Sequence, residues 1–159
     1  MRKIIPILMM GLGLMAACST LDCPLNNTVY TKYRLAGDIT TMTDTLTIST
    51  NRIEGTDSVL INKDVNVDSF ILPISYSLLE DSLFFEIRDI ENRLYVDTVT
   101  VKKTNTPHFE SVDCKPTFFH TITDVKTTHY RIDSIVINNK EVTYDETKPH
   151  FYIYFGHRD

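Results

Sequence analysis

Glycine is scarce in this chain, and long apolar runs are nearly absent. Only five glycines occur among 159 residues, and two of them lie in the first 17 positions. The sequence therefore has neither a phosphate-cradling glycine-rich loop nor the Gly-x-Ser-x-Gly turn of serine hydrolases. Beyond residue 17 no apolar stretch approaches the ~20 residues that a spanning helix needs. We expect no integral membrane domain.

Positive charge is also limited. The chain has sixteen Lys and Arg against twenty-one Asp and Glu, and without Arg2 and Lys3 fourteen basic residues remain, for a net charge of −7. An acidic domain repels phosphate backbones and anionic headgroups, which argues against a nucleic-acid partner. The densest basic cluster is Lys102-Lys103, which we interpret as a solvated strand edge.

The first 17 residues have the pattern of an export signal. Arg2 and Lys3 precede an apolar run over 4–15, and Ala16-Ala17 place two small side chains before Cys18. The run is short for a spanning helix and contains one proline and two glycines. An ordinary secretory signal would leave the cysteine without a role. We therefore predict a signal peptide over 1–17 that is cleaved before the cysteine.

Residues 14–18, Leu-Met-Ala-Ala-Cys, resemble the lipobox of bacterial lipoproteins. The resemblance implies that Cys18 is the lipid attachment site and that 18–27 form a lipidated tether. Each buried methylene of the lipid contributes ~0.8 kcal/mol to membrane binding. Because Ser19 rather than Asp follows the cysteine, the resemblance implies the outer membrane. The single nearby acid, Asp22, favours the periplasmic face over the cell surface.

Two cysteines remain if Cys18 is acylated. In an oxidising compartment Cys23 and Cys114 are expected to form a structural disulfide. A loop of that length stabilises a fold by ~4 kcal/mol in the chain-entropy model. The alternative is a redox pair, but redox cysteines usually stand close together, as in Cys-x-x-Cys.

From residue 28 onward, apolar residues recur at every second position, which is typical of strands. The pattern predicts nine or ten short strands, over 29–35, 45–50, 57–62, 69–73, 82–87, 94–102, 116–123, 132–138, 141–144 and 151–155. Pro73 is expected at a sheet edge or bulge. Turns are expected at 54–56, around Glu91-Asn92, and at Asn138-Asn139, because asparagine tolerates positive φ.

The predicted fold class is all-β. A single domain over 28–159 is expected, as an immunoglobulin-like or transthyretin-like β-sandwich, with a small β-barrel as the alternative. The 142 residues after position 17 are enough to bury ~68% of the unfolded surface, so the fold needs no metal.

Four segments of the chain resemble a family of small uncharacterised lipoproteins from gut Bacteroidota. They are 21–30 after the lipid cysteine, the strand at 44–48, the segment 69–75 and the segment 118–122. The resemblance implies a compact, lipid-anchored β domain. It implies no activity, because the family has no assigned catalytic residues.

The sequence contains no complete catalytic or metal-binding motif. Asn62, Asp64, Asn66 and Asp68 place oxygens at alternate positions, as in a calcium loop, but the glycine and glutamate that the loop needs are missing. A polar loop explains the pattern as well. Glu80-Asp81 is typical of a solvated turn. We predict no catalytic residue, no metal ligand and no cofactor.

The five histidines, His108, His120, His129, His150 and His157, show neither His-x-His nor His-Glu-x-x-His spacing. His120, between Phe119 and Thr121, is expected to be a packed or hydrogen-bonded strand residue.

The final aromatic segment allows two interpretations. In 151–155, Tyr152 and Tyr154 face one way and the phenylalanines the other, so both faces are largely apolar. This is typical of a central strand. The functional alternative is a partner-binding face made by the two tyrosines, since tyrosine is favoured in interfaces.

Taken together, these features predict a lipid-anchored envelope protein that acts as a non-enzymatic binding or scaffold module. The expected partner is an envelope protein or a glycan. The alternatives are an enzyme of envelope polymers with a site assembled from separate strands, and a small-ligand carrier with an open apolar cavity.

Overall fold

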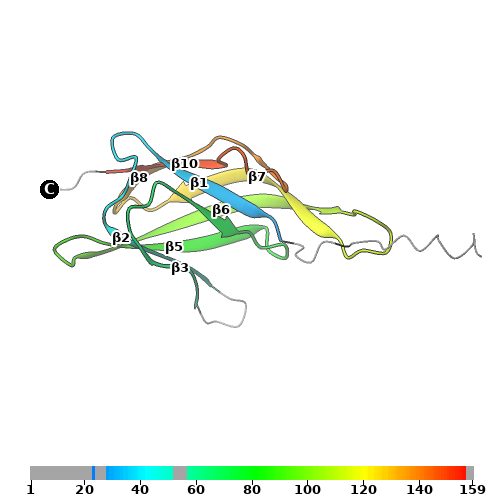
Figure 1. Cartoon of the computed structure of the whole chain (residues 1–159), viewed down its shortest axis with the longest axis horizontal. Coiled ribbons are helices and arrows are strands. Elements are labelled where there is room, and N and C mark those ends of the chain that lie inside the picture. The colour runs from blue at the N-terminus through cyan, green and yellow to red at the C-terminus, as the bar shows by residue number, and fades with distance from the viewer. Residues whose placement is uncertain (1–22, 24–27, 52–56, 157–159) are drawn as a thin grey trace, which may run out of the picture.

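The structure, a computed structural model, describes Cys23, residues 28–51 and residues 57–156 (Figure 1). The predicted signal peptide, Cys18, the expected turn at 54–56 and His157 lie outside the described residues. The elements are β1 (Tyr30–Ala36), β2 (Thr45–Asn51), β3 (Asp57–Asp64), β4 (Ser69–Pro73), β5 (Glu80–Arg88), β6 (Leu94–His108), β7 (Thr117–Thr127), β8 (Ile132–Ile137), β9 (Glu141–Val142) and β10 (Phe151–Phe155). Among the described residues, no helix has the length and apolar character to cross a membrane.

The strands form two sheets that lie one over the other (Figure 1). The smaller sheet has the order β4-β1-β10-β8, and the larger has the order β3-β2-β5-β6-β7-β9. The first and last strands, β1 and β10, are parallel neighbours, with Tyr33 opposite Phe151. The other neighbours are antiparallel. The prediction of an all-β sandwich is confirmed.

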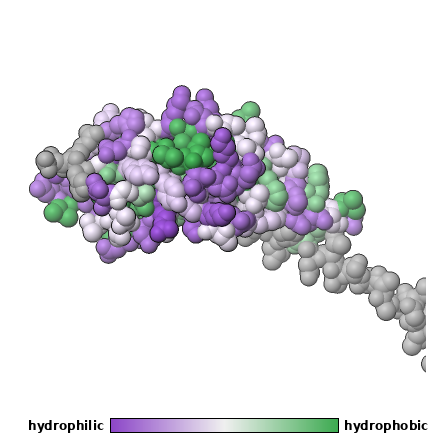
Figure 2. Space-filling model, turned by 90° about the horizontal axis from the view of Figure 1, so that it is seen from above, coloured by the Kyte–Doolittle hydropathy of each residue, from purple (hydrophilic) through white to green (hydrophobic). Residues whose placement is uncertain are grey.

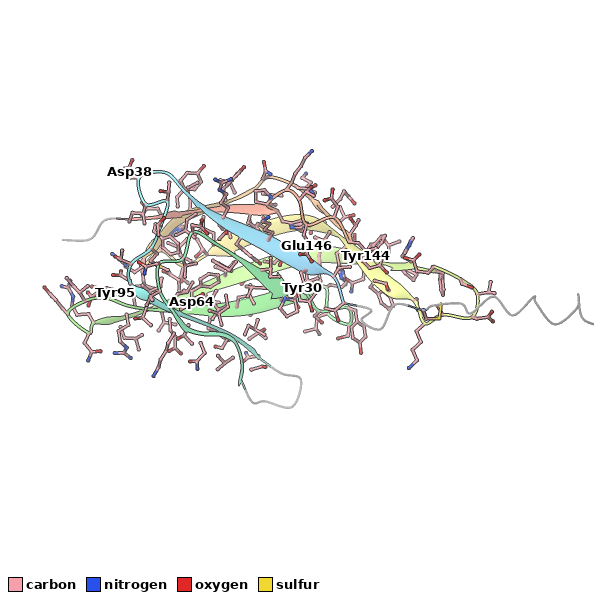
Figure 3. All side chains as sticks on the ribbon, viewed as in Figure 1. Tyr30, Asp38, Asp64, Tyr95, Tyr144 and Glu146 are labelled. Carbon is pink, nitrogen blue, oxygen red and sulfur yellow. A yellow bond between two sulfur atoms is a disulfide. The ribbon has the colours of Figure 1, made fainter. Side chains whose placement is uncertain are left out.

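Aliphatic and aromatic side chains together fill the space between the sheets (Figure 3). Tyr33 stacks on Phe70 and on Phe151, with ring centroids 5.1 and 4.7 Å apart. Phe70 in turn meets Phe85 of the larger sheet at 6.0 Å. Burial alternates along β1 and β10, as the period of two predicts. Because these rings are close-packed, the sandwich interior is a filled core.

Two of the expected turn and edge residues lie where the sequence places them. Pro73 ends β4, which is an edge strand of the smaller sheet. Asn92 has a φ of 65° in the turn between β5 and β6.

The turn at Asn138-Asn139 differs from the prediction. Neither asparagine has a positive φ. The segment passes from β8 in the smaller sheet to β9 in the larger one, and the backbone N–H groups of Asn138 and Asn139 both donate to the carbonyl of His150, at 2.8 and 3.2 Å. The Asn138-Asn139 segment therefore connects the two sheets and does not form a hairpin within one of them.

The inner face of β6 carries charge as well as apolar side chains. Asp97, Val99, Val101 and Lys103 alternate along the strand, and all four are buried. The interpretation of Lys102-Lys103 as a solvated edge is therefore wrong for Lys103. Only Lys102 faces solvent, because neighbouring side chains of a strand point to opposite faces.

Asp97 organises the connection between β7 and β8. One carboxylate oxygen accepts hydrogen bonds from Thr128 Oγ1 and Tyr130 N, both at 2.8 Å. The other accepts from Arg131 N at 2.6 Å and Ile132 N at 2.9 Å. Four donors offset the cost of taking this carboxylate out of water.

The disulfide between Cys23 and Cys114 is present, with the two Cα atoms 5.5 Å apart. It joins residues 91 positions apart in the chain. The bond holds the segment before β1 to the loop between β6 and β7, as the sequence predicted.

Replacing Asp97 with Ala should lower the free energy of unfolding by about 3 kcal/mol or more, because three backbone amides lose their acceptor. Thr128→Val removes one hydrogen bond to the same carboxylate and also the acceptor of the Thr98 N–H, and should cost about 1–2 kcal/mol. Guanidinium unfolding followed by circular dichroism measures both. Equal, small losses would contradict the role given to the carboxylate.

Candidate functional site

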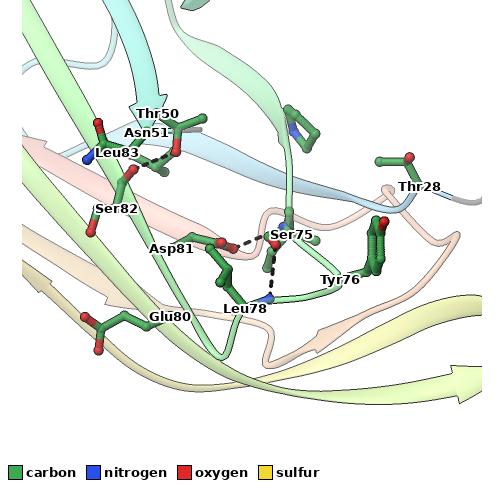
Figure 4. A pocket seen from close by; sticks show the side chains of 12 residues that line it. Thr28, Thr50, Asn51, Ser75, Tyr76, Leu78, Glu80, Asp81, Ser82 and Leu83 are labelled. Atoms are coloured by element: carbon green, nitrogen blue, oxygen red, sulfur yellow. Dashed lines mark hydrogen bonds between the residues drawn. The ribbon is translucent and has the colours of Figure 1, made fainter. Parts of the chain in front are cut away.

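A recess lies on one side of the sandwich, between the β4–β5 loop and the ends of β2 and β5 (Figure 4). Its volume is about 640 Å³. Its lining includes Thr50, Asn51, Ser75, Tyr76, Asp81 and Ser82. A smaller hollow of about 320 Å³ shares Thr28 and Tyr76 with it and reaches Phe118. The two hollows therefore meet at Tyr76.

Local hydrogen bonds shape the β4–β5 loop (Figure 4). The Ser75 hydroxyl accepts from the backbone N–H of Leu78 at 3.2 Å, and the Ser75 N–H donates to Asp81 Oδ2 at 3.2 Å. On the far side of the recess, Thr50 Oγ1 donates to the Ser82 carbonyl at 2.8 Å. Both walls are held by contacts that require no ligand.

A buried ion pair lies under the loop. Lys103 Nζ contacts Asp81 Oδ2 at 2.7 Å, and the lysine side chain has no exposed area. The same ammonium donates to the Leu78 carbonyl at 2.8 Å. The interpretation of Glu80-Asp81 as a solvated turn is wrong for Asp81, which is largely buried, whereas Glu80 faces solvent. The pair fixes the loop to β6.

Asn105 extends this network to the next strand. Its Nδ2 donates to the Tyr76 carbonyl at 2.9 Å and to the Leu78 carbonyl at 3.1 Å. Its Oδ1 lies 2.8 Å from His120 Nδ1. Since this oxygen only accepts, the imidazole carries its proton on Nδ1. His120 is buried and hydrogen-bonded, which confirms its expected role.

Burial, together with the nearby charge of Lys103, lowers the pKa of His120 from 6.5 to about 4. Protonation would bring a second positive charge into a site that already contains an ammonium. The histidine is therefore neutral at pH 7, and its single ring proton serves the hydrogen bond to Asn105.

Tyr76 is the exposed aromatic residue of the recess. Its side chain is 65% exposed, and its ring stacks on Phe118 at a centroid distance of 5.7 Å. The backbone of the loop is held by Asn105, so the ring is both accessible and supported. An aromatic face beside hydroxyl and amide groups suits the docking of a protein surface or a sugar.

The other histidines in the described part of the chain make local contacts. His108 stacks on Phe119 at 4.2 Å and contacts Glu110 at 3.2 Å. His129 Nδ1 lies 3.2 Å from the Ile132 carbonyl. His150 Nδ1 accepts from the backbone N–H of Lys32 at 2.9 Å, and burial lowers the pKa of this histidine.

The residues of the calcium-like pattern lie in and after β3. Asp64 accepts a hydrogen bond from the N–H of Val65 at 3.0 Å, and Asp68 accepts one from the Ser69 hydroxyl at 2.7 Å. Asn66 has a φ of 56°. Within the described part of the chain, no group of three His, Cys, Asp or Glu side chains is placed to hold a metal ion.

Tyr152 and Tyr154 lie on the outer face of the smaller sheet, and both are half-buried. Their strand, β10, is central, between β1 and β8. Figure 2 looks onto this side of the molecule and shows a small hydrophobic area surrounded by hydrophilic side chains. The partner-binding role of these tyrosines stays a prediction.

The sequence alone indicated no role for Tyr76 or Asn105, and its pattern was interpreted as placing Lys103 in solvent. The alternation along β6 could have predicted the burial of Lys103, because this residue is on the same face of the strand as Val99 and Val101. A lysine at an inward position requires a carboxylate partner. No comparable signal exists for Tyr76, because its support comes from another strand.

The ion pair predicts an asymmetry in stability. Asp81→Asn should lower the free energy of unfolding by about 3–5 kcal/mol, because it leaves a fully buried ammonium without its counter-ion. Lys103→Met should cost less, since the apolar side chain fills the same space and Asp81 still reaches water. Lys102→Met is the matched control, because its ion pair is exposed, and it should cost less than about 0.5 kcal/mol. Chemical unfolding of the three variants tests this order, which equal losses for all three would contradict.

His120 predicts an acid-dependent loss of stability. Its folded pKa, about 4, lies below the ordinary value of 6.5, so the unfolded chain takes up a proton first. Stability is retained above pH 6.5 and falls as the pH drops through 4, by about 3 kcal/mol in total. His120→Gln should flatten this part of the profile. His150 still contributes in both proteins, so the measured quantity is the difference between their unfolding free energies at pH 7 and pH 4.5. Parallel profiles would contradict the assignment.

A comparison with curated proteins found no match, and a comparison with solved structures found none either. A family model described as a family of unknown function, DUF6452, matches residues 45–155. The match begins at the first residue of β2 and ends at the last residue of β10, so it covers the larger sheet, three of the four strands of the smaller sheet and the recess lining except Thr28, whereas β1 lies outside it. The chain belongs to the DUF6452 family.

Proposed function

We propose that this protein is a lipid-anchored, non-enzymatic binding module of the bacterial cell envelope, held through Cys18 in the outer membrane on its periplasmic face. The lipobox-like segment 14–18 supports the anchor. The disulfide between Cys23 and Cys114 is consistent with an oxidising compartment such as the periplasm. The negative net charge favours an envelope protein or a glycan over nucleic acid as the partner.

The observation that carries the binding role is the supported Tyr76 ring. The ring is exposed, yet Phe118 stacks on it and Asn105 holds its backbone carbonyl. A preorganised aromatic side chain loses little conformational entropy when a partner docks. The recess beside it adds hydroxyl and amide groups that can orient the partner.

The contacts in the recess favour a binding module over the two other classes of function. An enzyme of envelope polymers needs a carboxylate or histidine that is free to exchange protons. The two carboxylates in the lining, Glu80 and Asp81, each contact a lysine ammonium, at 3.5 and 2.7 Å. A small-ligand carrier needs an internal apolar cavity, whereas stacked rings such as Tyr33 and Phe151 fill the space between the sheets.

Site-specific photo-crosslinking in intact cells tests the proposal. A photoreactive amino acid at position 76 should yield one discrete adduct, whereas the same group at Ile90, in the turn between β5 and β6, should yield none. Phe118→Ala removes the support of the ring and should lower the yield at position 76. Cys18→Ala should release the protein from the membrane fraction and also lower the yield, because the tether raises the local concentration.

The same experiment compares the two candidate surfaces. An adduct formed from position 152 and not from position 76 would move the binding face to Tyr152 and Tyr154. No adduct from either position would overturn the binding role. Unchanged membrane fractionation of Cys18→Ala would overturn the lipid anchor.

A further inference from the structure

The hairpin of β6 and β7 projects beyond the rest of its sheet. β5 pairs with β6 only as far as Lys102, which lies opposite Glu80. From Lys103 to His108 the ladder continues with β7 alone, over about 20 Å of strand. The hairpin therefore forms a narrow extension at one end of the long axis (Figure 1).

The tip of this hairpin, residues 109–116, exposes apolar side chains. Phe109 is 59% exposed and Val112 is 97% exposed. The two side chains, three positions apart, leave apolar surface in water at the end of the projecting hairpin. The tip also carries charges of both signs, from Glu110, Asp113 and Lys115.

The disulfide places this tip close to the proposed lipid. Cys23 is five positions after Cys18, so their Cα atoms lie at most about 18 Å apart. The Cα atoms of Cys23 and Cys114 are 5.5 Å apart. The Cα atom of Cys114, in the tip, therefore stays within about 24 Å of the Cα atom of the acylated residue, whatever path the intervening chain takes. The turn between β5 and β6 is at the other end of β6, which spans 15 residues or about 50 Å.

We propose that Phe109 and Val112 insert into the interface of the bilayer that holds the Cys18 lipid, so that the sandwich stands on its β6–β7 hairpin. The inference rests on the proposed lipid anchor. Aromatic and aliphatic side chains at headgroup depth bury apolar surface, and the tether keeps their local concentration at the bilayer high. Mixed charges at the tip fit zwitterionic headgroups, which present both signs, better than anionic ones.

The absence of tryptophan from the chain makes a direct test practical. Phe109→Trp introduces a single indole at the tip, and Ile90→Trp introduces the matched control at the opposite end, where Ile90 is 93% exposed. Each full-length acylated protein is reconstituted into phosphatidylcholine vesicles with brominated acyl chains. The indole at position 109 should be blue-shifted and quenched about twofold or more by the bromine atoms, and the indole at position 90 should be unaffected.

A second variant and a mass measurement separate the outcomes. Val112→Asp in the Phe109→Trp background should abolish the quenching while the protein stays bound to the vesicles. If intact-protein mass shows the acyl chains but the indole at position 109 is not quenched, the insertion is overturned and the anchor stands. If the acyl mass is absent, both proposals fail. A blue shift that depends on protein concentration and not on lipid would show a protein partner at the tip and overturn the insertion.

Discussion

One strand buries a charge of each sign, and this constraint shapes both ends of the sandwich. On the inner face of β6, Asp97 and Lys103 flank two valines. A charge removed from water needs a partner of its own. Asp97 obtains four hydrogen bonds from 128–132, and Lys103 obtains an ion pair with Asp81. Each charge thereby holds one connecting loop over the end of the larger sheet.

The features on which the two proposals depend gather at the Lys103 end of β6. The loop that Lys103 holds presents Tyr76 beside the recess. From the same point β6 runs on into the projecting hairpin, whose tip is bonded through Cys114 to the segment before β1. The proposed partner surface and the proposed bilayer contact therefore lie at the same end of the molecule, where the smaller hollow joins Tyr76 to the base of the hairpin tip at Lys115 and Pro116.

Much of the fold follows from local pattern, and the errors share a cause. The alternation of apolar residues predicts the strands, and Pro73 and Asn92 lie at the edge and the turn where their backbone preferences place them. Lys103 and Asp81 were interpreted as solvated because charged residues usually are. Their burial depends on each other, and a partner 22 positions away is invisible to a local window. The crossing after Asn138 was missed for the same reason, since sheet membership is set by long-range pairing.

By itself, the sequence determines the all-β class, the approximate strand ranges and the one cysteine pair available once Cys18 is assigned to the lipid. These depend on side-chain period, on backbone preference and on counting, all of which are local. Only the tertiary structure decides that Tyr76 stacks on Phe118 and that Lys103 lies under the β4–β5 loop. Those contacts exist because β5 and β7 pair on either side of β6, and strand pairing joins residues that no local pattern relates.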